Sequence, residues 1–224
     1  MIRKALPMAR SSVRLARFQN RCFSSEISKV EKELARVLDS EIQSEVEDTE
    51  RDSYITSFLE DNKWTLDANL NSTKILLSKN VGDATVKVYC QAKAPQALPE
   101  GEENADEGAQ DENNYTEFFI LIDRNGPNKV LLDAFAMDGE LTINGILVSP
   151  KAEDIAESKD TSPYNYTGPS FETLDENLQN KISKYVKQLG LDEDFARFVE
   201  EASVTHESKL YKKFLVDFKD FISK

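Results

Sequence analysis

One histidine limits the chemistry that this sequence can perform. His206 is the only histidine among the 224 residues, and it stands in the segment Thr205-His206-Glu207. Neither a catalytic triad nor a cluster of histidine metal ligands can be built around a single ring without groups from another chain. We therefore expect His206 to have a structural role, and the sequence predicts no catalytic residue.

A second chemical motif is a partial calcium loop. Asp123, Asn125 and Gly126 are spaced like the opening of such a loop, but Pro127 occupies the fifth position. Ala134 stands where a Glu would close the twelve-residue frame. The segment is typical of a hairpin turn instead. No ligand spacing for a specific metal site is present, and we expect no cofactor.

Carboxylates are abundant, but the densest group lies in a segment that nothing fixes in place. Residues 94–113 contain two prolines, two glycines, seven acids and no base. Such a segment cannot bury enough apolar surface to offset its ordering cost, so it is predicted to be a disordered, mobile acidic loop. General acid/base catalysis needs two fixed groups, whereas binding of basic partners does not. Loose calcium binding by the loop stays open. The predicted partner-binding residues are Glu100, Glu102, Glu103, Asp106, Glu107, Asp111 and Glu112.

Charge separates the N-terminus from the rest of the chain. Residues 1–23 contain six of the 28 basic residues and no acid, which is typical of a mitochondrial transit peptide. Arg21 lies three residues before Ser24, so we expect cleavage at Ser24. The remaining 22 basic and 41 acidic residues give a net charge of −19, which favours basic partners over nucleic acid and anionic lipid. No later stretch approaches the roughly 20 apolar residues of a membrane span, so we expect no stable membrane insertion.

Periodicity predicts one α+β domain over residues 24–224. An amphipathic helix is expected over 26–47, because apolar residues recur there at helical spacing. Alternating residues and turn signals then predict an antiparallel sheet. Its expected strands are 64–69, 73–79, 84–92, 115–123, 129–137 and 140–149, with a short edge strand over 164–171. Three helices follow: one that begins at the capping box Thr173 to Glu176 and stops at Gly190, one capped by Asp192, and one over 206–222.

The last helix has a wide aromatic stripe that predicts an oligomer interface. Leu210, Phe214, Phe218 and Phe221 stack on one side of it. This stripe and that of residues 26–47 exceed what one small sheet needs to cover. Packing within the chain's own core is the alternative, and it stays open.

Several segments together resemble the mitochondrial glycoprotein family. They are residues 71–79, 118–123 with 138–140, 166–179, 190–195 and 211–221, and the resemblance covers Trp64 to Lys224. It implies a twisted seven-stranded antiparallel sheet flanked by one N-terminal and two C-terminal helices, in a homotrimeric ring. It also implies chaperones or scaffolds that serve mitochondrial ribosome assembly, translation and respiratory function, and it offers no catalytic residues to carry over.

The main hypothesis is therefore a mitochondrial matrix scaffold or chaperone that binds basic proteins, ribosomal proteins among them, and meets RNA only indirectly. If the acidic loop were a passive spacer, binding would fall to an acidic face around Glu153, Asp154, Glu157 and Asp160. The alternative is a direct RNA-binding factor of mitochondrial ribosome biogenesis, which the net charge and the lack of a basic patch disfavour. A hydrolase is third, because nucleophile, base and metal ligands are missing from the sequence.

Overall fold

The computed structural model describes residues 21–45, 48–92, 115–158 and 167–223. Within these ranges, six strands form one antiparallel sheet whose spatial order follows the chain order. The strands are β1 (Thr65–Ala68), β2 (Lys74–Val81), β3 (Ala84–Gln91), β4 (Thr116–Asp123), β5 (Lys129–Met137) and β6 (Glu140–Ser149). The helices are α1 (Arg21–Ser44), α2 (Thr49–Asn62), α3 (Ala152–Ser158), the short 3-10 helix η1 (Phe171–Thr173), α4 (Glu176–Gln188) and α5 (Glu193–Ile222). The α+β class and the antiparallel sheet are confirmed.

Tight turns join the strands where small or polar residues adopt positive φ. Gly82, between β2 and β3, has a φ of 61°, and Asp138 and Gly139, between β5 and β6, have φ values of 54° and 76°. Two-residue hairpins need this left-handed backbone. The partial calcium loop is also a turn: Asn125 has a φ of 57°, and its N–H donates to the Asp123 carboxylate at 2.8 Å.

Different helices cover the two faces of the sheet. On one face, Val86, Val88 and Phe118 join Phe195 and Phe198 of α5 in the main core, to which α2 and α4 also contribute. On the other face, the short helix α3 covers a smaller cluster. The side chains of this second cluster are Leu121, Leu131, Leu147, Ala152, Ile155 and Ala156. The sheet is therefore a central layer with its larger core towards α5.

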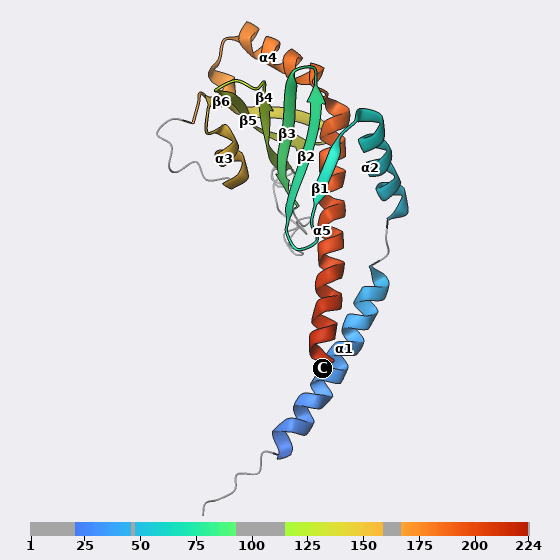
Figure 1. Cartoon of the computed structure of the whole chain (residues 1–224). Helices are drawn as coiled ribbons and strands as arrows, with labels where there is room; N and C mark the ends of the chain where they lie inside the picture. The colour runs from blue at the N-terminus through green and yellow to red at the C-terminus, as the bar shows by residue number, and fades with distance from the viewer. Residues whose placement is uncertain (1–20, 46–47, 93–114, 159–166, 224) are drawn as a thin grey trace, which may run out of the picture.

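Helix α5 extends well beyond the sheet (Figure 1). It has 30 residues and is therefore about 45 Å long at the rise of an α-helix. Helix α1 lies beside its C-terminal part, where Leu38 is buried and Lys219 pairs with Asp39 at 2.5 Å. We call α1 and residues 207–222 of α5 the stalk, and the rest of the fold the body.

Two predictions are wrong: the seventh strand of the sheet and the capping residue of α4. Among the described residues the sheet has six strands, because the expected edge strand at 164–171 is reduced to one bridge between Ser170 and Gly145. Residues 164–166 lie outside the described residues. Pro169 has no N–H to donate to a ladder, and Gly168 approaches β6 so closely that a Cβ would lie 1.8 Å from the Ile146 carbonyl oxygen. The cap of α4 is Asp175 rather than the expected Thr173, which belongs to η1.

The helix predictions are wrong in three places. Helices α2 and α3 were not expected, and the last two expected helices are one continuous helix, α5, because no Gly or Pro interrupts residues 193–222. The one N-terminal and two C-terminal helices of the expected layout are present as α1, α4 and α5. Gly190 follows the C-cap of α4 with a φ of 84°, as the predicted helix stop. The Asp192 carboxylate caps α5, also as predicted, by accepting from the Phe195 N–H at 3.1 Å.

Candidate partner-binding surfaces

An acidic groove lies between α2, α5 and the β5–β6 turn. It has a volume of about 1060 Å³ and is also bordered by Thr116, the first residue of β4. Among the described residues that line it, the basic side chains are Arg51 and Arg197. The acidic lining residues are Asp48, Glu50, Asp61, Asp138, Asp194, Glu200 and Glu201. Seven carboxylates thus face two guanidinium groups, and we call this site the acidic groove.

Local geometry fixes the walls of the acidic groove. Asp48 caps α2 by accepting from the Arg51 N–H at 2.9 Å, and the Arg51 side chain reaches Glu201 of α5 at 2.5 Å. The Glu200 carboxylate accepts from the Gly139 N–H at 3.0 Å. Gly139 has a φ of 76°, which favours glycine, and a Cβ there would lie 2.7 Å from the Cγ of an α5 arginine, so a larger residue would displace that side chain. These contacts join α2 to α5 and α5 to the β5–β6 turn.

The acids of the groove influence one another. Burial raises the pKa of Glu200, and the backbone N–H groups of the turn partly oppose this increase. Burial also raises the pKa of Tyr54, and the negative charges of Asp194 and Glu201 add to that increase. Neighbouring carboxylates repel each other. A cationic side chain placed in the groove would relieve this repulsion, which favours a basic occupant.

The predicted partner-binding acids of the 94–113 loop lie outside the described residues. The chain on both sides of that segment is nevertheless placed next to α5. The Ser203 hydroxyl donates to the carbonyl oxygen of Gln91, at the end of β3, at 3.4 Å. On the other side, Thr116 lines the acidic groove together with Val204 of α5. The described chain therefore stops beside α5 before this segment and resumes beside the acidic groove after it.

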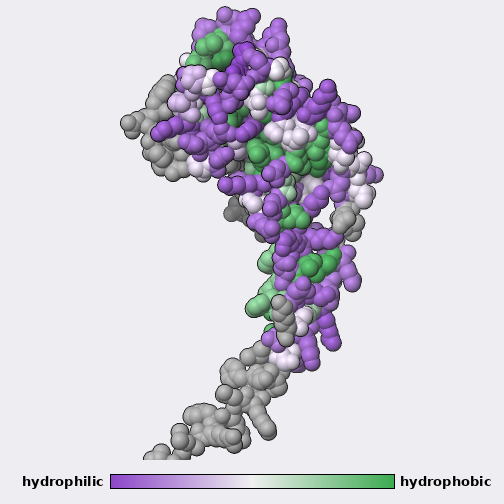
Figure 2. Space-filling view, viewed as in Figure 1, coloured by the Kyte–Doolittle hydropathy of each residue, from purple (hydrophilic) through white to green (hydrophobic). Residues whose placement is uncertain are grey.

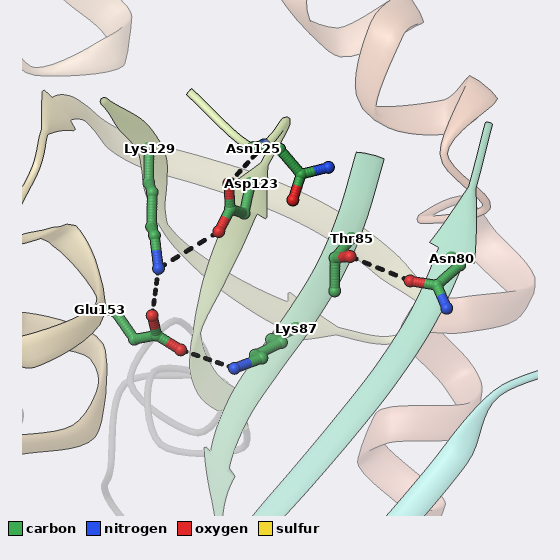
Figure 3. A network of polar contacts seen from close by, with 7 residues as sticks. All are labelled: Asn80, Thr85, Lys87, Asp123, Asn125, Lys129 and Glu153. Atoms are coloured by element: carbon green, nitrogen blue, oxygen red, sulfur yellow. Dashed lines mark hydrogen bonds and ion pairs between the residues drawn. The ribbon is translucent and has the colours of Figure 1, made fainter. Parts of the chain in front are cut away.

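The second predicted acidic face, around α3, is partly neutralised by lysines (Figure 3). Glu153 accepts from Lys87 of β3 at 2.5 Å and also from Lys129 of β5, which pairs with Asp123 at 3.2 Å. The hydrogen bonds from Lys129 and Lys87 lower the pKa of Glu153 to about 2. Asp154 and Glu157 are exposed, and Asp160 lies outside the described residues. Glu153 thus anchors α3 to the sheet and is not available to a partner.

The stalk leaves aromatic side chains uncovered. Phe214 is 55% exposed and Phe221 is 72% exposed, whereas Leu210 packs partly against the main core. Phe218 is half-buried and stacks on Phe214 with ring centroids 5.8 Å apart. Further exposed apolar side chains of the stalk are Tyr211, Val216, Val30 and Val37. The predicted interface residues 214 and 221 are therefore accessible to a partner, while residue 210 serves this chain's own fold.

His206 has the structural environment that the sequence predicts. It is buried within α5, and its Nε2–H donates to the carbonyl oxygen of Ser72, in the β1–β2 turn, at 2.8 Å. No group of three or more metal-binding side chains occurs in the described ranges. None of the helices that the structure describes is long and apolar enough to cross a membrane.

Comparison with known proteins identifies relatives of this chain. A family model described as mitochondrial glycoprotein, MAM33, matches residues 38–222. The mitochondrial acidic protein mam33 of Schizosaccharomyces pombe is 24% identical over 174 residues, a match that covers 67% of this chain and 65% of the relative. The chain thus spans about 65% of the length of the curated relative that it matches.

Two solved structures share the fold. A hypothetical protein from Leishmania major, described as a sequence homologue to human p32 protein with unknown function, has a TM-score of 0.63 at 20% identity and covers 86% of this chain and 99% of its own. The p22 protein of Trypanosoma brucei has a TM-score of 0.63 at 17% identity and covers 86% and 98%. At this level of identity the likeness concerns the fold alone.

The sheet, the stalk and the acidic groove define the class as an acidic α+β protein with a p32-like fold. The family match over 38–222 extends from α1 to the end of α5. The chain belongs to the mitochondrial glycoprotein family, a family of mitochondrial proteins. The curated relative is named for its acidity and not for a reaction.

Proposed function

We propose that this chain is an acidic scaffold or chaperone of the mitochondrial matrix that binds basic proteins and supports ribosome assembly and translation. The acidic groove is the observation that carries this proposal, because seven carboxylates and two arginines are its charged lining residues among those that the structure describes. Residues 94–113 add seven more acids between Gln91, which lies beside α5, and Thr116, which lines the groove. Import would remove residues 1–23 and with them six basic residues.

The groove and the loop have complementary roles in this proposal. The loop acids raise the local concentration of basic clients and speed their encounter. The groove acids are held in place by α2, α5 and the β5–β6 turn, so they can retain a lysine or arginine side chain at short range. Clients with exposed basic segments, such as ribosomal proteins before assembly, fit this chemistry. RNA is then bound only through the protein clients.

We also propose that the protein is a homotrimer whose stalk is covered by neighbouring copies. Phe214 and Phe221 are the most exposed phenylalanines of α5, and covering one phenylalanine stabilises an interface by roughly 1.5–3 kcal/mol. Repulsion between acidic chains opposes association, so the apolar contact has to exceed it. The exposed stalk aromatics supply a surface of that kind.

The test of client binding removes three groove carboxylates that make no ion pair among the described residues. The variant Glu50→Gln, Asp61→Asn, Asp138→Asn keeps the fold, since Asn also suits the positive φ of position 138. A matched control, Glu41→Gln, Asp154→Asn, Glu157→Gln, changes the net charge equally at exposed sites outside the groove. Affinity for a basic mitochondrial ribosomal protein is measured at low and moderate salt.

The groove variant should bind at least tenfold more weakly than the control and should show a smaller salt dependence. Exposed charges are screened beyond about 8 Å at 0.15 M salt, so only a partner close to the groove should respond. Equal losses in both variants would mean that net charge alone attracts the client, and the groove would have no specific role. Loss in the control alone would move the site to α3. RNase treatment of captured clients separates protein binding from direct RNA binding.

A further inference from the structure

Among the helices that the structure describes, α4 is the one with more basic than acidic residues. It contains three lysines and one carboxylate, Glu176, in its first turn, whereas the whole chain has a net charge of −13. Lys187 pairs with Glu193 at 2.6 Å. Lys181 and Lys184 are exposed, and neither makes an ion pair with any residue that the structure describes. Two cationic side chains are therefore available on this helix.

Apolar side chains are exposed next to these lysines. Leu178 is 47% exposed and Tyr185 is 39% exposed. They are seven residues apart, so they lie on the same side of α4, and Lys181 lies one turn from each of them. Val186, on another side of the helix, is buried in the main core. The exposed face formed by Leu178, Lys181, Lys184 and Tyr185 is called the α4 face below.

The α4 face is accessible to a flat surface. Helix α4 lies at the end of the molecule opposite the stalk (Figure 1). Figure 2 shows an apolar patch among hydrophilic side chains at the same end. The pocket beside α4 is lined by Ser183, Val186 and Lys187 of this helix, and Leu178, Lys181 and Lys184 lie outside that pocket. The face suits a partner that approaches as a plane.

We propose that the α4 face docks the protein on an anionic lipid surface. Lysines next to exposed apolar side chains are the combination that holds a helix at a membrane interface, because the apolar groups enter the headgroup boundary and the lysines remain with the lipid phosphates. Charge complementarity selects anionic headgroups over zwitterionic ones. The docking is peripheral and reversible, since only two apolar side chains can enter the interface.

A lipid surface fits this face better than single-stranded RNA does. RNA binding without sequence preference uses a basic track with several stacked aromatic rings, and the α4 face offers one ring, Tyr185. Leu178 gains from an acyl boundary but has no comparable contact with a phosphate backbone. Carboxylates lie near both ends of α4: Asp175 and Glu176 at its start, and Glu193, Asp192 and Glu140 near Lys187 at its end. They confine the attraction to the middle of the helix.

The negative charge of the rest of the protein does not prevent this contact. At 0.15 M salt the Debye length is about 8 Å, so repulsion from distant carboxylates is largely screened. The lysines on the α4 face come within that distance of the lipid phosphates. The contact therefore also sets the orientation of the protein, with the α4 end towards the membrane and the stalk away from it.

The test uses the mature, full-length protein and vesicles of phosphatidylcholine with or without phosphatidylglycerol. Co-sedimentation of the unaltered protein is compared with that of Lys181→Gln, Lys184→Gln and of Leu178→Ser. The matched control is Lys29→Gln, Lys32→Gln, which has the same helical spacing and charge change on the exposed part of α1. Each lysine near an anionic surface should change partitioning roughly fivefold, so the double variant should lose more than tenfold.

The control should bind phosphatidylglycerol vesicles like the unaltered protein, and phosphatidylcholine vesicles should bind none of the proteins. Leu178→Ser should weaken binding without abolishing it. Equal losses in the two lysine pairs, or equal binding to both vesicle types, would overturn the proposal. Labelled single-stranded RNA is titrated in parallel. If RNA bound through Lys181 and Lys184 while the vesicles stayed unbound, the α4 face would be a nucleic-acid surface and the lipid proposal would be wrong.

Discussion

The two parts of α5 differ in what covers their aromatic side chains. In the body, Phe195 and Phe198 are 0% exposed and contact the sheet and α2. In the stalk, Phe214 and Phe221 are 55% and 72% exposed although α1 lies alongside. One continuous helix thus completes the core of a single chain at its start and leaves apolar surface at its end. The body therefore fills its core with side chains of its own chain, whereas the stalk leaves aromatic side chains open to a partner, as the proposed trimer requires.

The largest expected effect is a loss of stability when a core ring of the body is removed. Phe198 stacks on Phe58 of α2 with ring centroids 4.2 Å apart and an interplanar angle of 11°. Phe198→Ala should lower the free energy of unfolding by about 3–5 kcal/mol, because a large buried ring leaves a cavity. Chemical denaturation monitored by circular dichroism measures the change. A loss below about 1 kcal/mol would contradict the assignment of this ring to the core.

The next effect is dissociation of the assembly through the stalk, while the body stays folded. Phe214→Ser, Phe221→Ser should dissociate the assembly, with association weakened well over tenfold, because each covered ring contributes roughly 1.5–3 kcal/mol. The circular dichroism spectrum of the protein should stay the same, because neither ring belongs to the main core of the body. Light scattering at several concentrations measures the mass. An unaltered protein that is monomeric would contradict the trimer, and an unfolded double variant would contradict the division into body and stalk.

A smaller effect concerns the half-buried ion cluster of the body. Glu153→Gln should lower the free energy of unfolding at pH 7 by about 1–2 kcal/mol, a value reduced from the pKa difference because solvent screens the partly exposed carboxylate. The folded pKa of Glu153, about 2, lies below its usual value of 4.5. Its stabilisation is therefore complete above about pH 4.5 and disappears as the pH falls towards 2. The variant should lose this pH dependence, while Asp154→Asn on the same helix should keep it.

The sequence predicts the sheet better than the helices for a local reason. Strands β5 and β6 have the expected bounds because side-chain alternation and the Asp138-Gly139 turn lie within the segment itself. Helix α2 was missed because its buried residues, Ile55 and Phe58, form a narrow stripe. The stripe can be recognised as a buried face only from its contact with α5, and α5 is distant from α2 in the sequence.

The acidic groove could not be predicted from the sequence, whereas the family could. Its acids come from α2, the β5–β6 turn and α5, so their spacing in the chain carries no signal. The pairing of Glu153 with Lys87 joins residues 66 positions apart and has the same origin. The aromatic stripe of the stalk was visible because it follows helical periodicity within one segment. Even there, the sequence could not distinguish Leu210, which packs inward, from Phe214, which does not.

The smallest expected effect concerns an ion pair between the two helices of the stalk. Lys219 and Asp39 join α5 to α1 at 2.5 Å, and their side chains are 36% and 48% exposed. Exposed pairs contribute about 0–1 kcal/mol, so Asp39→Asn should change the free energy of unfolding by less than 1 kcal/mol and should change it less in high salt. Thermal unfolding at low and high salt measures both. The substitution should leave the mass of the assembly unchanged, because apolar burial and not this pair holds the stalk together.

A loss as large as that of Glu153→Gln would mean that copies of the chain bury this pair in the assembly. The stalk would then depend on charge as much as on its phenylalanines.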